Sequence, residues 1–187
     1  MRYLAVFAIA ASCLFATSCV GDTISHSYKF SYRTSSGNAV DTHLDIADGR
    51  NASSGSDGET AWPAQSSSGV LVGIYKTNGT DGWNGTTGFY GEDIRETLQG
   101  GASITFNDIY LWATPGTESQ DLHLRLQDGP SLDGVSLTLS LVSVPSGVTY
   151  TGPTEWGSET TDIVLPFYST DDGKTGYKFR ITITAAQ

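Results

Sequence analysis

Three tryptophans stand in polar, glycine-rich stretches of the sequence, where an indole ring would be offered to a ligand. Trp62, Trp83 and Trp156 have loop-like neighbours, and Tyr90 follows shortly after Trp83. A flat apolar ring beside polar groups stacks on sugar rings or anchors a protein contact at low entropic cost. These four residues are the predicted ligand-binding residues. Trp112 instead ends a predicted strand and is expected in the core. The alternative for each loop tryptophan is that it folds down to cap the domain.

Carboxylates are plentiful, but their sequence contexts predict no catalytic residue. A glycosidase needs two acids facing one another across a cleft. The available acids lie in turn-like or polar stretches rather than on strand faces interleaved with aromatics. The chain also has no Gly-x-Ser-x-Gly elbow and no His-Glu-x-x-His motif, so we expect a protein that is not an enzyme. The acids considered are Glu92, Asp93, Glu118, Glu155 and Glu159.

Acidic residues in predicted loops could supply oxygen ligands to a calcium ion. None has the spacing of an EF-hand or of a calcium-binding repeat, and Asp before Gly is also a common way to build a tight turn. We therefore expect no obligatory cofactor and leave calcium open. The candidate ligands are Asp45, Asp48, Asn51, Asp57, Glu59, Asp171 and Asp172.

Two histidines, His43 and His123, lie on the polar faces of predicted strands, each beside acidic residues. If the two strands were neighbours, imidazoles and carboxylates would form a surface metal site. An ordinary hydrated strand face accounts for the same residues. The choice depends on the order of the strands in the sheet.

The first 18 residues have the parts of a secretory signal peptide. Arg2 supplies a positive start, and an apolar or small run extends from Leu4 to Ala16. This run is too short to cross a bilayer, which takes about 20 apolar residues. Residues 1–18 are therefore predicted to be a signal peptide, and residues 19–187 a single β-sandwich domain.

The residues that end the predicted signal, Ala16 to Cys19, resemble a bacterial lipobox, in which the cysteine is acylated and becomes the mature N-terminus. The residue three before the cysteine is usually Leu and is Ala16 here. The resemblance implies lipidation of Cys19 and an outer-membrane anchor. Cleavage by ordinary signal peptidase would instead leave an extracellular protein. No cysteine follows Cys19, so the domain must be stabilised by a hydrophobic core rather than by an internal disulfide.

Acidic residues outnumber basic ones, with 20 Asp and Glu against 10 Lys and Arg and a formal net charge of −10. Such a surface repels phosphate backbones and anionic lipids. We therefore expect no nucleic-acid partner, and contact with a membrane only through a lipid anchor. A protein or a polysaccharide at the cell surface is the expected partner.

Apolar residues recur at every second position in five segments of the chain. This period is typical of a strand with one face in a core and the other in water. Asp-Gly and Asn-Gly dipeptides between the segments accept the positive φ angles of tight turns. The chain is thus predicted to be all-β, an antiparallel β-sandwich or jelly roll of about eight to ten strands. The segments are 26–32, 40–46, 121–126, 135–141 and 177–184.

Three further strands are predicted on weaker patterns. In one of them the alternation slips at Asn107-Asp108, which is typical of a β-bulge. In another, Pro166 has no N–H for the ladder, which predicts a place at the edge of a sheet. These strands span 70–76, 104–112 and 162–168.

Two stretches do not alternate, residues 48–69 and 77–101. Loops of this length in a compact domain are functional or disordered. Within the second, residues 92–98 combine acidic and basic side chains and predict one or two turns of helix.

Two functions remain open. The first is a non-catalytic surface protein, an adhesin or fimbria-like subunit, for which the alternating segment Thr23–Arg33 would be a suitable strand to donate to a neighbouring subunit. The alternative is a carbohydrate-binding module that uses Trp83, Tyr90 and Trp156, with a structural calcium ion.

Overall fold

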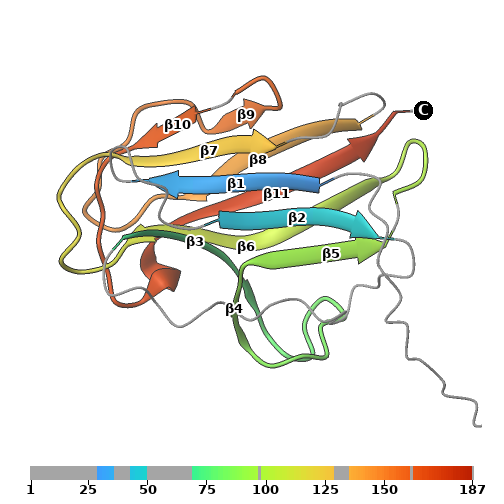
Figure 1. Ribbon diagram of the computed structural model, residues 1–187, viewed down its shortest axis with the longest axis horizontal. Coiled ribbons are helices and arrows are strands. Elements are labelled where there is room, and N and C mark those ends of the chain that lie inside the picture. Colours follow the sequence, from blue (N-terminus) through green and yellow to red (C-terminus); the bar gives the residue numbers. More distant parts are fainter. Residues whose placement is uncertain are drawn as a thin grey trace, which may run out of the picture.

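Two β-sheets packed face to face form the protein in the computed structural model (Figure 1). The structure describes residues 29–35, 43–49, 69–96, 98–128, 135–160 and 162–186. The predicted signal peptide, the predicted lipidation site Cys19 and the predicted binding residue Trp62 lie outside these ranges. Within them, no helix has the length and apolar character needed to span a membrane.

The first sheet has five strands, and its two edges are β10 and β5. Neighbouring strands run antiparallel, except that β5 pairs in parallel with β2. In order across the sheet, the strands are β10 (Asp162–Leu165), β7 (Leu122–Asp128), β1 (Lys29–Ser35), β2 (His43–Gly49) and β5 (Glu92–Glu96).

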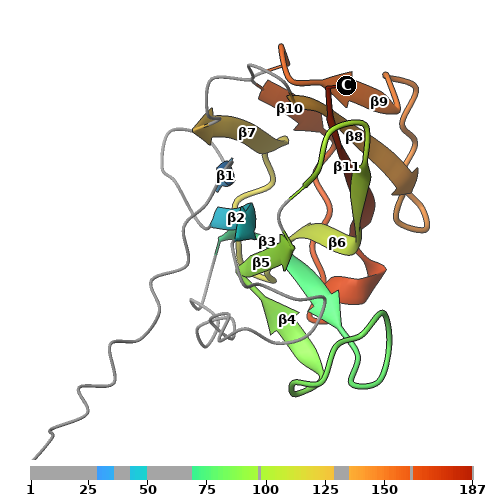
Figure 2. The ribbon, with the colours of Figure 1, turned by 90° about the vertical axis from the view of Figure 1, so that its right-hand side faces the viewer.

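The second sheet has six strands, all paired antiparallel. Figure 2 shows it edge-on beside the first sheet. A single turn of 3-10 helix, η1 (Gly173–Thr175), precedes its strand β11. In order across the sheet, the strands are β4 (Gly88–Tyr90), β3 (Val70–Lys76), β6 (Ser103–Ala113), β11 (Tyr177–Ala185), β8 (Val135–Ser143) and β9 (Glu155–Gly157).

Alternate residues of each strand point into the space between the sheets. Leu44 and Ile46 on β2 are buried in the same core as Phe179 and Ile181 on β11. The predicted antiparallel β-sandwich is therefore confirmed. The described residues hold eleven strands rather than eight to ten, because β4 and β9 are each three residues long and too short to show an alternation.

The predicted bulge lies in β6. Phe179 pairs with Ile109 and Ile181 pairs with Phe106, so two residues of β6 stand opposite one residue of β11. Asp108 in the bulge has a φ of 57°, in the left-handed region. The edge position predicted from Pro166 is also confirmed, because β10 ends one residue before it.

The helix predicted over residues 92–98 is wrong, since residues 92–96 form strand β5. The backbone of β2 offers unpaired hydrogen-bonding groups at the edge of the sheet, and pairing with them overrides the local preference of a polar segment. The structure also bears on the prediction that Thr23–Arg33 is a strand donated to a neighbouring subunit. Residues 29–33 of the segment Thr23–Arg33 lie in β1 and pair within the chain with both β2 and β7.

A second apolar cluster lies on the outer face of the six-stranded sheet. Leu71, Tyr110 and Trp112 form its buried part, at the strand positions that alternate with the main core. The predicted burial of Trp112 is confirmed. The turn η1 lies against the indole ring of Trp112, and a Cβ atom added to Gly173 would lie 2.7 Å from an atom of that ring.

We expect Gly173→Ala to destabilise the protein by about 1–3 kcal/mol, because the new methyl group has no space beside the rigid indole of Trp112. The matched control is Gly88→Ala, where a Cβ would meet nothing within 4 Å, and its effect should stay below about 0.5 kcal/mol. Urea unfolding measures both. Equal effects would show that the turn moves freely away from the ring.

Alkaline pH should destabilise the sandwich through Tyr177. Burial, followed by the charges of Asp121 and Tyr150, raises the pKa of Tyr177 from 10.0 to about 12. The folded state therefore holds the phenol proton more tightly than the unfolded chain does. This stabilisation is complete below about pH 10 and is lost as the pH rises through about 12.

The measurement is the free energy of unfolding between about pH 8 and pH 12, compared with Tyr177→Phe. The variant loses the hydrogen bond that the phenol donates to the carbonyl of Pro166, but it should show a shallower decline above about pH 10. Parallel curves for the two proteins would contradict this assignment.

Candidate functional site

The aromatic residues predicted to bind a ligand are mostly buried. Trp83 is 2% exposed and Tyr90 is 6% exposed, and their rings meet edge to face with centroids 4.8 Å apart. The prediction that these two rings offer an open stacking surface is therefore wrong, and they fold down onto the core instead. Burial leaves no polar atom unpaired, because the indole N–H and the Tyr90 hydroxyl both donate to the carbonyl of Thr86. Trp156 is half-buried on β9 and packs against Phe179.

The loop that holds Trp83 connects β3 to β4, and its backbone is fixed by its own hydrogen bonds. The amide of Trp83 donates to the carbonyl of Thr80 at 2.9 Å, and the amide of Gly79 donates to the carbonyl of Trp83 at 2.8 Å. At the base of the loop, the amide of Asn78 donates to the hydroxyl of Thr87 at 3.0 Å. We call residues 77–87 the hairpin loop.

Beside the hairpin loop, three charged side chains meet between the two sheets. Asp93 on β5 is 1% exposed and contacts the ammonium of Lys76 on β3. Arg95 on the same strand contacts both oxygens of this carboxylate. Its Nε lies 2.9 Å from Oδ1, and its Nη2 donates at 3.0 Å to Oδ2, the oxygen that Lys76 also contacts. Removing a carboxylate this far from water is costly unless cations contact it, as they do here. We call Lys76, Asp93 and Arg95 the charged triad.

One aromatic ring lies close to each cation of the triad. The ammonium of Lys76 lies 5.4 Å from the centre of the Trp83 ring, and the guanidinium of Arg95 lies 5.5 Å from the centre of the Phe106 ring. Both distances are within the range of cation–π attraction. The burial of Trp83 therefore positions Lys76.

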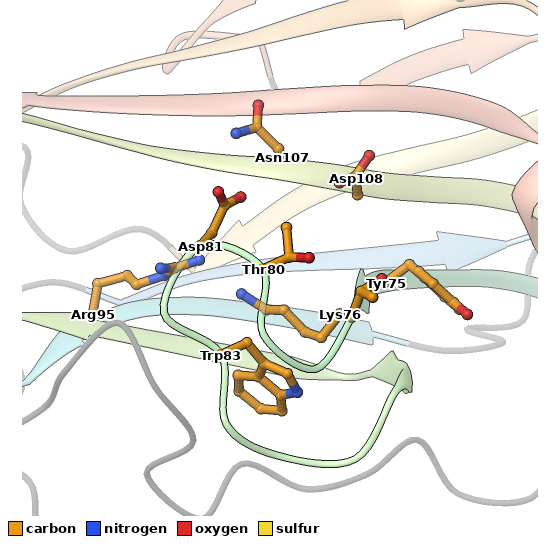
Figure 3. A pocket seen from close by; sticks show the side chains of 9 residues that line it. Tyr75, Lys76, Thr80, Asp81, Trp83, Arg95, Asn107 and Asp108 are labelled. Carbon is orange, nitrogen blue, oxygen red and sulfur yellow. The ribbon is translucent and has the colours of Figure 1, made fainter.

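A small pocket opens between the hairpin loop and the bulge of β6 (Figure 3). Lys76 and Arg95 both line it and extend toward one another above the Trp83 ring. Asp93, which they share, is not part of the lining. The cavity volume is about 30 Å³, which suits one or two water molecules or a small polar group rather than a whole sugar ring. The full lining comprises Tyr75, Lys76, Thr77, Thr80, Asp81, Trp83, Arg95, Asn107 and Asp108.

The two carboxylates of the lining differ in their surroundings. The Nζ atom of Lys178 lies 2.5 Å from Oδ1 of Asp108, and the hydrogen bond between them raises the pKa of Lys178. Asp81 is exposed on the hairpin loop with a φ of 52°, and its carboxylate has no partner in the described part of the chain. It is therefore available to a ligand at the mouth of the pocket.

The condition for a metal site between the two histidines, that their strands be neighbours, is not met. Strand β1 lies between β2, which carries His43, and β7, which carries His123. The Nδ1 atom of His123 instead lies 3.1 Å from the carboxylate of Asp162 on β10. Within the described ranges, no three His, Cys, Asp or Glu side chains are grouped to hold a metal ion.

The possible calcium ligands are only partly described. Asn51, Asp57 and Glu59 lie outside the described residues. Asp172 accepts a hydrogen bond from the amide of Lys174 and caps the turn η1, which agrees with the turn-forming role that Asp-Gly pairs indicate. Calcium therefore remains an open expectation.

Sequence reasoning missed the two cations of the pocket. Lys76 continues the series Val70, Val72 and Ile74 at every second position, and these residues face the core. A lysine at an inward position of an alternating strand is a signal for a buried charge partner. Neither its partner nor the pocket follows from that signal, because Asp93 is 17 residues away.

No protein-family model, curated protein or solved structure matches this chain. The functional assignment therefore rests on the residues and their geometry.

The charged triad predicts an asymmetry between two substitutions. Asp93→Asn removes the carboxylate that both buried cations contact and should cost about 3–5 kcal/mol. Lys76→Met leaves the Asp93–Arg95 pair intact and places an apolar chain beside Trp83, so its cost should be much smaller. The measurement is the free energy of urea unfolding at neutral pH. A larger loss for Lys76→Met than for Asp93→Asn would contradict this account of the triad.

Proposed function

We propose that this chain is an exported, non-catalytic β-sandwich protein that acts in adhesion or assembly at the cell surface, with the pocket beside the hairpin loop as its contact site. The observation that carries the proposal is the rigid construction of this pocket. A loop fixed by internal hydrogen bonds on a packed sandwich presents charged groups without further ordering, which lowers the entropic cost of binding a partner.

The chemistry of the pocket favours binding over hydrolysis. Hydrolysis of a glycosidic bond needs one carboxylic acid that holds a proton and a second that is ionised. Two cations lie at the base of this pocket, and both carboxylates stand at its rim, Asp108 paired with Lys178 and Asp81 exposed on the hairpin loop. Such an arrangement suits the binding of a polar ligand.

Export is supported by the signal-like segment 1–18. Lipidation of Cys19 would anchor the protein in the outer membrane, whereas ordinary cleavage would release it. The net charge of −10 favours a protein or polysaccharide partner over nucleic acid.

A second candidate function, carbohydrate binding, is favoured by the mixture of groups around the pocket. Hydroxyl, amide and carboxylate groups from Thr80, Asn107 and Asp81 stand around one opening, and sugar hydroxyls both donate to and accept from such groups. This assignment keeps Trp83 at the site, as a wall of the pocket rather than as an open stacking platform. A calcium ion would bind elsewhere, because Lys76 and Arg95 repel it from the pocket.

Filling the pocket should abolish contact with the partner. Thr80→Tyr places a ring in the opening, and the matched control Thr151→Tyr adds the same ring at an exposed position that does not line the pocket. The measurements are binding of the purified protein to a panel of immobilised polysaccharides and its self-association by sedimentation velocity. We expect at least one of these activities in the unsubstituted protein, and its loss in Thr80→Tyr but not in Thr151→Tyr.

Three outcomes would overturn the proposal. The unsubstituted protein could show neither activity, or Thr80→Tyr could retain the activity. The third is the release of sugar from any polysaccharide on the panel, which would make the protein an enzyme.

A further inference from the structure

We infer that the pocket binds the carboxylate group of an acidic sugar, held between Lys76 and Arg95. This inference rests on the proposed binding role of the pocket and names the chemical class of its ligand.

The arrangement of the charged triad directs positive charge into the pocket. Both cations line the opening, whereas the Asp93 carboxylate that pairs with them does not. The side chain of Lys76 is 8% exposed and that of Arg95 is 13% exposed, so a ligand that reached them would be largely shielded from water. Charge-assisted hydrogen bonds are strongest under these conditions.

Arg95 keeps donors for such a ligand. Its hydrogen bond to Asp93 uses Nη2. Its Nε lies 2.9 Å from Oδ1 without a hydrogen bond, and no contact of Nη1 is found in the described part of the chain. A guanidinium presents N–H groups on more than one side, so a second carboxylate can bind next to the first.

Size and charge favour a carboxylate over a phosphate or a sulfate. The cavity of about 30 Å³ suits a small planar group. The carboxylates of Asp81 and Asp108 stand at the rim, and their repulsion grows with the charge of the ligand. A singly charged group is therefore the anion that this site tolerates best.

The rim favours a sugar as the carrier of this carboxylate. Thr80, Asp81 and Asn107 offer hydrogen-bond donors and acceptors where the ring hydroxyls of a uronic acid would lie. The net charge of −10 repels a polymer that is anionic along its whole length, so a uronic acid at a chain end or among neutral sugars is the expected form.

The test is a titration of the full chain with D-glucuronate, D-glucose and N-acetylglycine, followed by tryptophan fluorescence, since Trp83 forms a wall of the pocket. We expect glucuronate to bind at least about tenfold more tightly than glucose or N-acetylglycine, and Lys76→Met to weaken glucuronate binding by about tenfold or more. Lys76→Arg should retain most of the affinity. Arg125→Met is the control and should change nothing, because Arg125 on β7 pairs with Asp162 on β10 and neither residue lines the pocket.

Equal binding of glucuronate and glucose, or an unchanged affinity in Lys76→Met, would overturn the inference. N-acetylglycine binding as tightly as glucuronate would also overturn it, in favour of a protein carboxylate. If Lys76→Met does not fold, the affinities of Lys76→Arg for the three ligands still decide whether the pocket prefers glucuronate. Absence of glucuronate binding while Thr80→Tyr still abolishes partner binding refutes this inference alone, whereas loss of both results refutes the proposed function as well.

Discussion

Contact between the inner faces of the two sheets stabilises the molecule, because no cysteine after Cys19 is available for a crosslink. Side chains such as Leu44, Phe106 and Ile183 lose all their exposed surface there, and burying one such side chain is worth about 1.5–3 kcal/mol. Each strand must direct every second residue into this space. That requirement fixes the ends of the strands, and with them the positions of the loops.

At one edge of the sandwich, the same space holds charges instead of apolar groups. The edge strand β5 places Asp93 and Arg95 opposite Lys76, and the one carboxylate lies between the two cations. Their pairing holds a short strand, parallel to its neighbour β2, against the other sheet. The position that would be the weakest part of the apolar core therefore becomes a polar site that is partly open to solvent.

The pocket arises where this polar edge meets the hairpin loop and the bulge of β6. The loop brings Asp81 to the opening, and the bulge brings Asn107 and Asp108. Both elements deviate from regular strand geometry, and such deviations are common where a sheet presents a functional group. A binding role and a structural role therefore use the same residues, because the triad that joins the sheets also supplies the cations of the pocket.

The sequence alone determined the strands with a long alternation, the bulge at Asn107-Asp108 and the sheet edge before Pro166, because each follows from a local pattern of side-chain types. It did not determine β5, the burial of Trp83 or the ion pair of Lys76 with Asp93. These features depend on which strands become neighbours, and a three-residue strand such as β4 carries no period that would reveal its partner. Only the tertiary structure decided that Trp83 is a buried wall of the pocket, while cations that the sequence did not single out also line it.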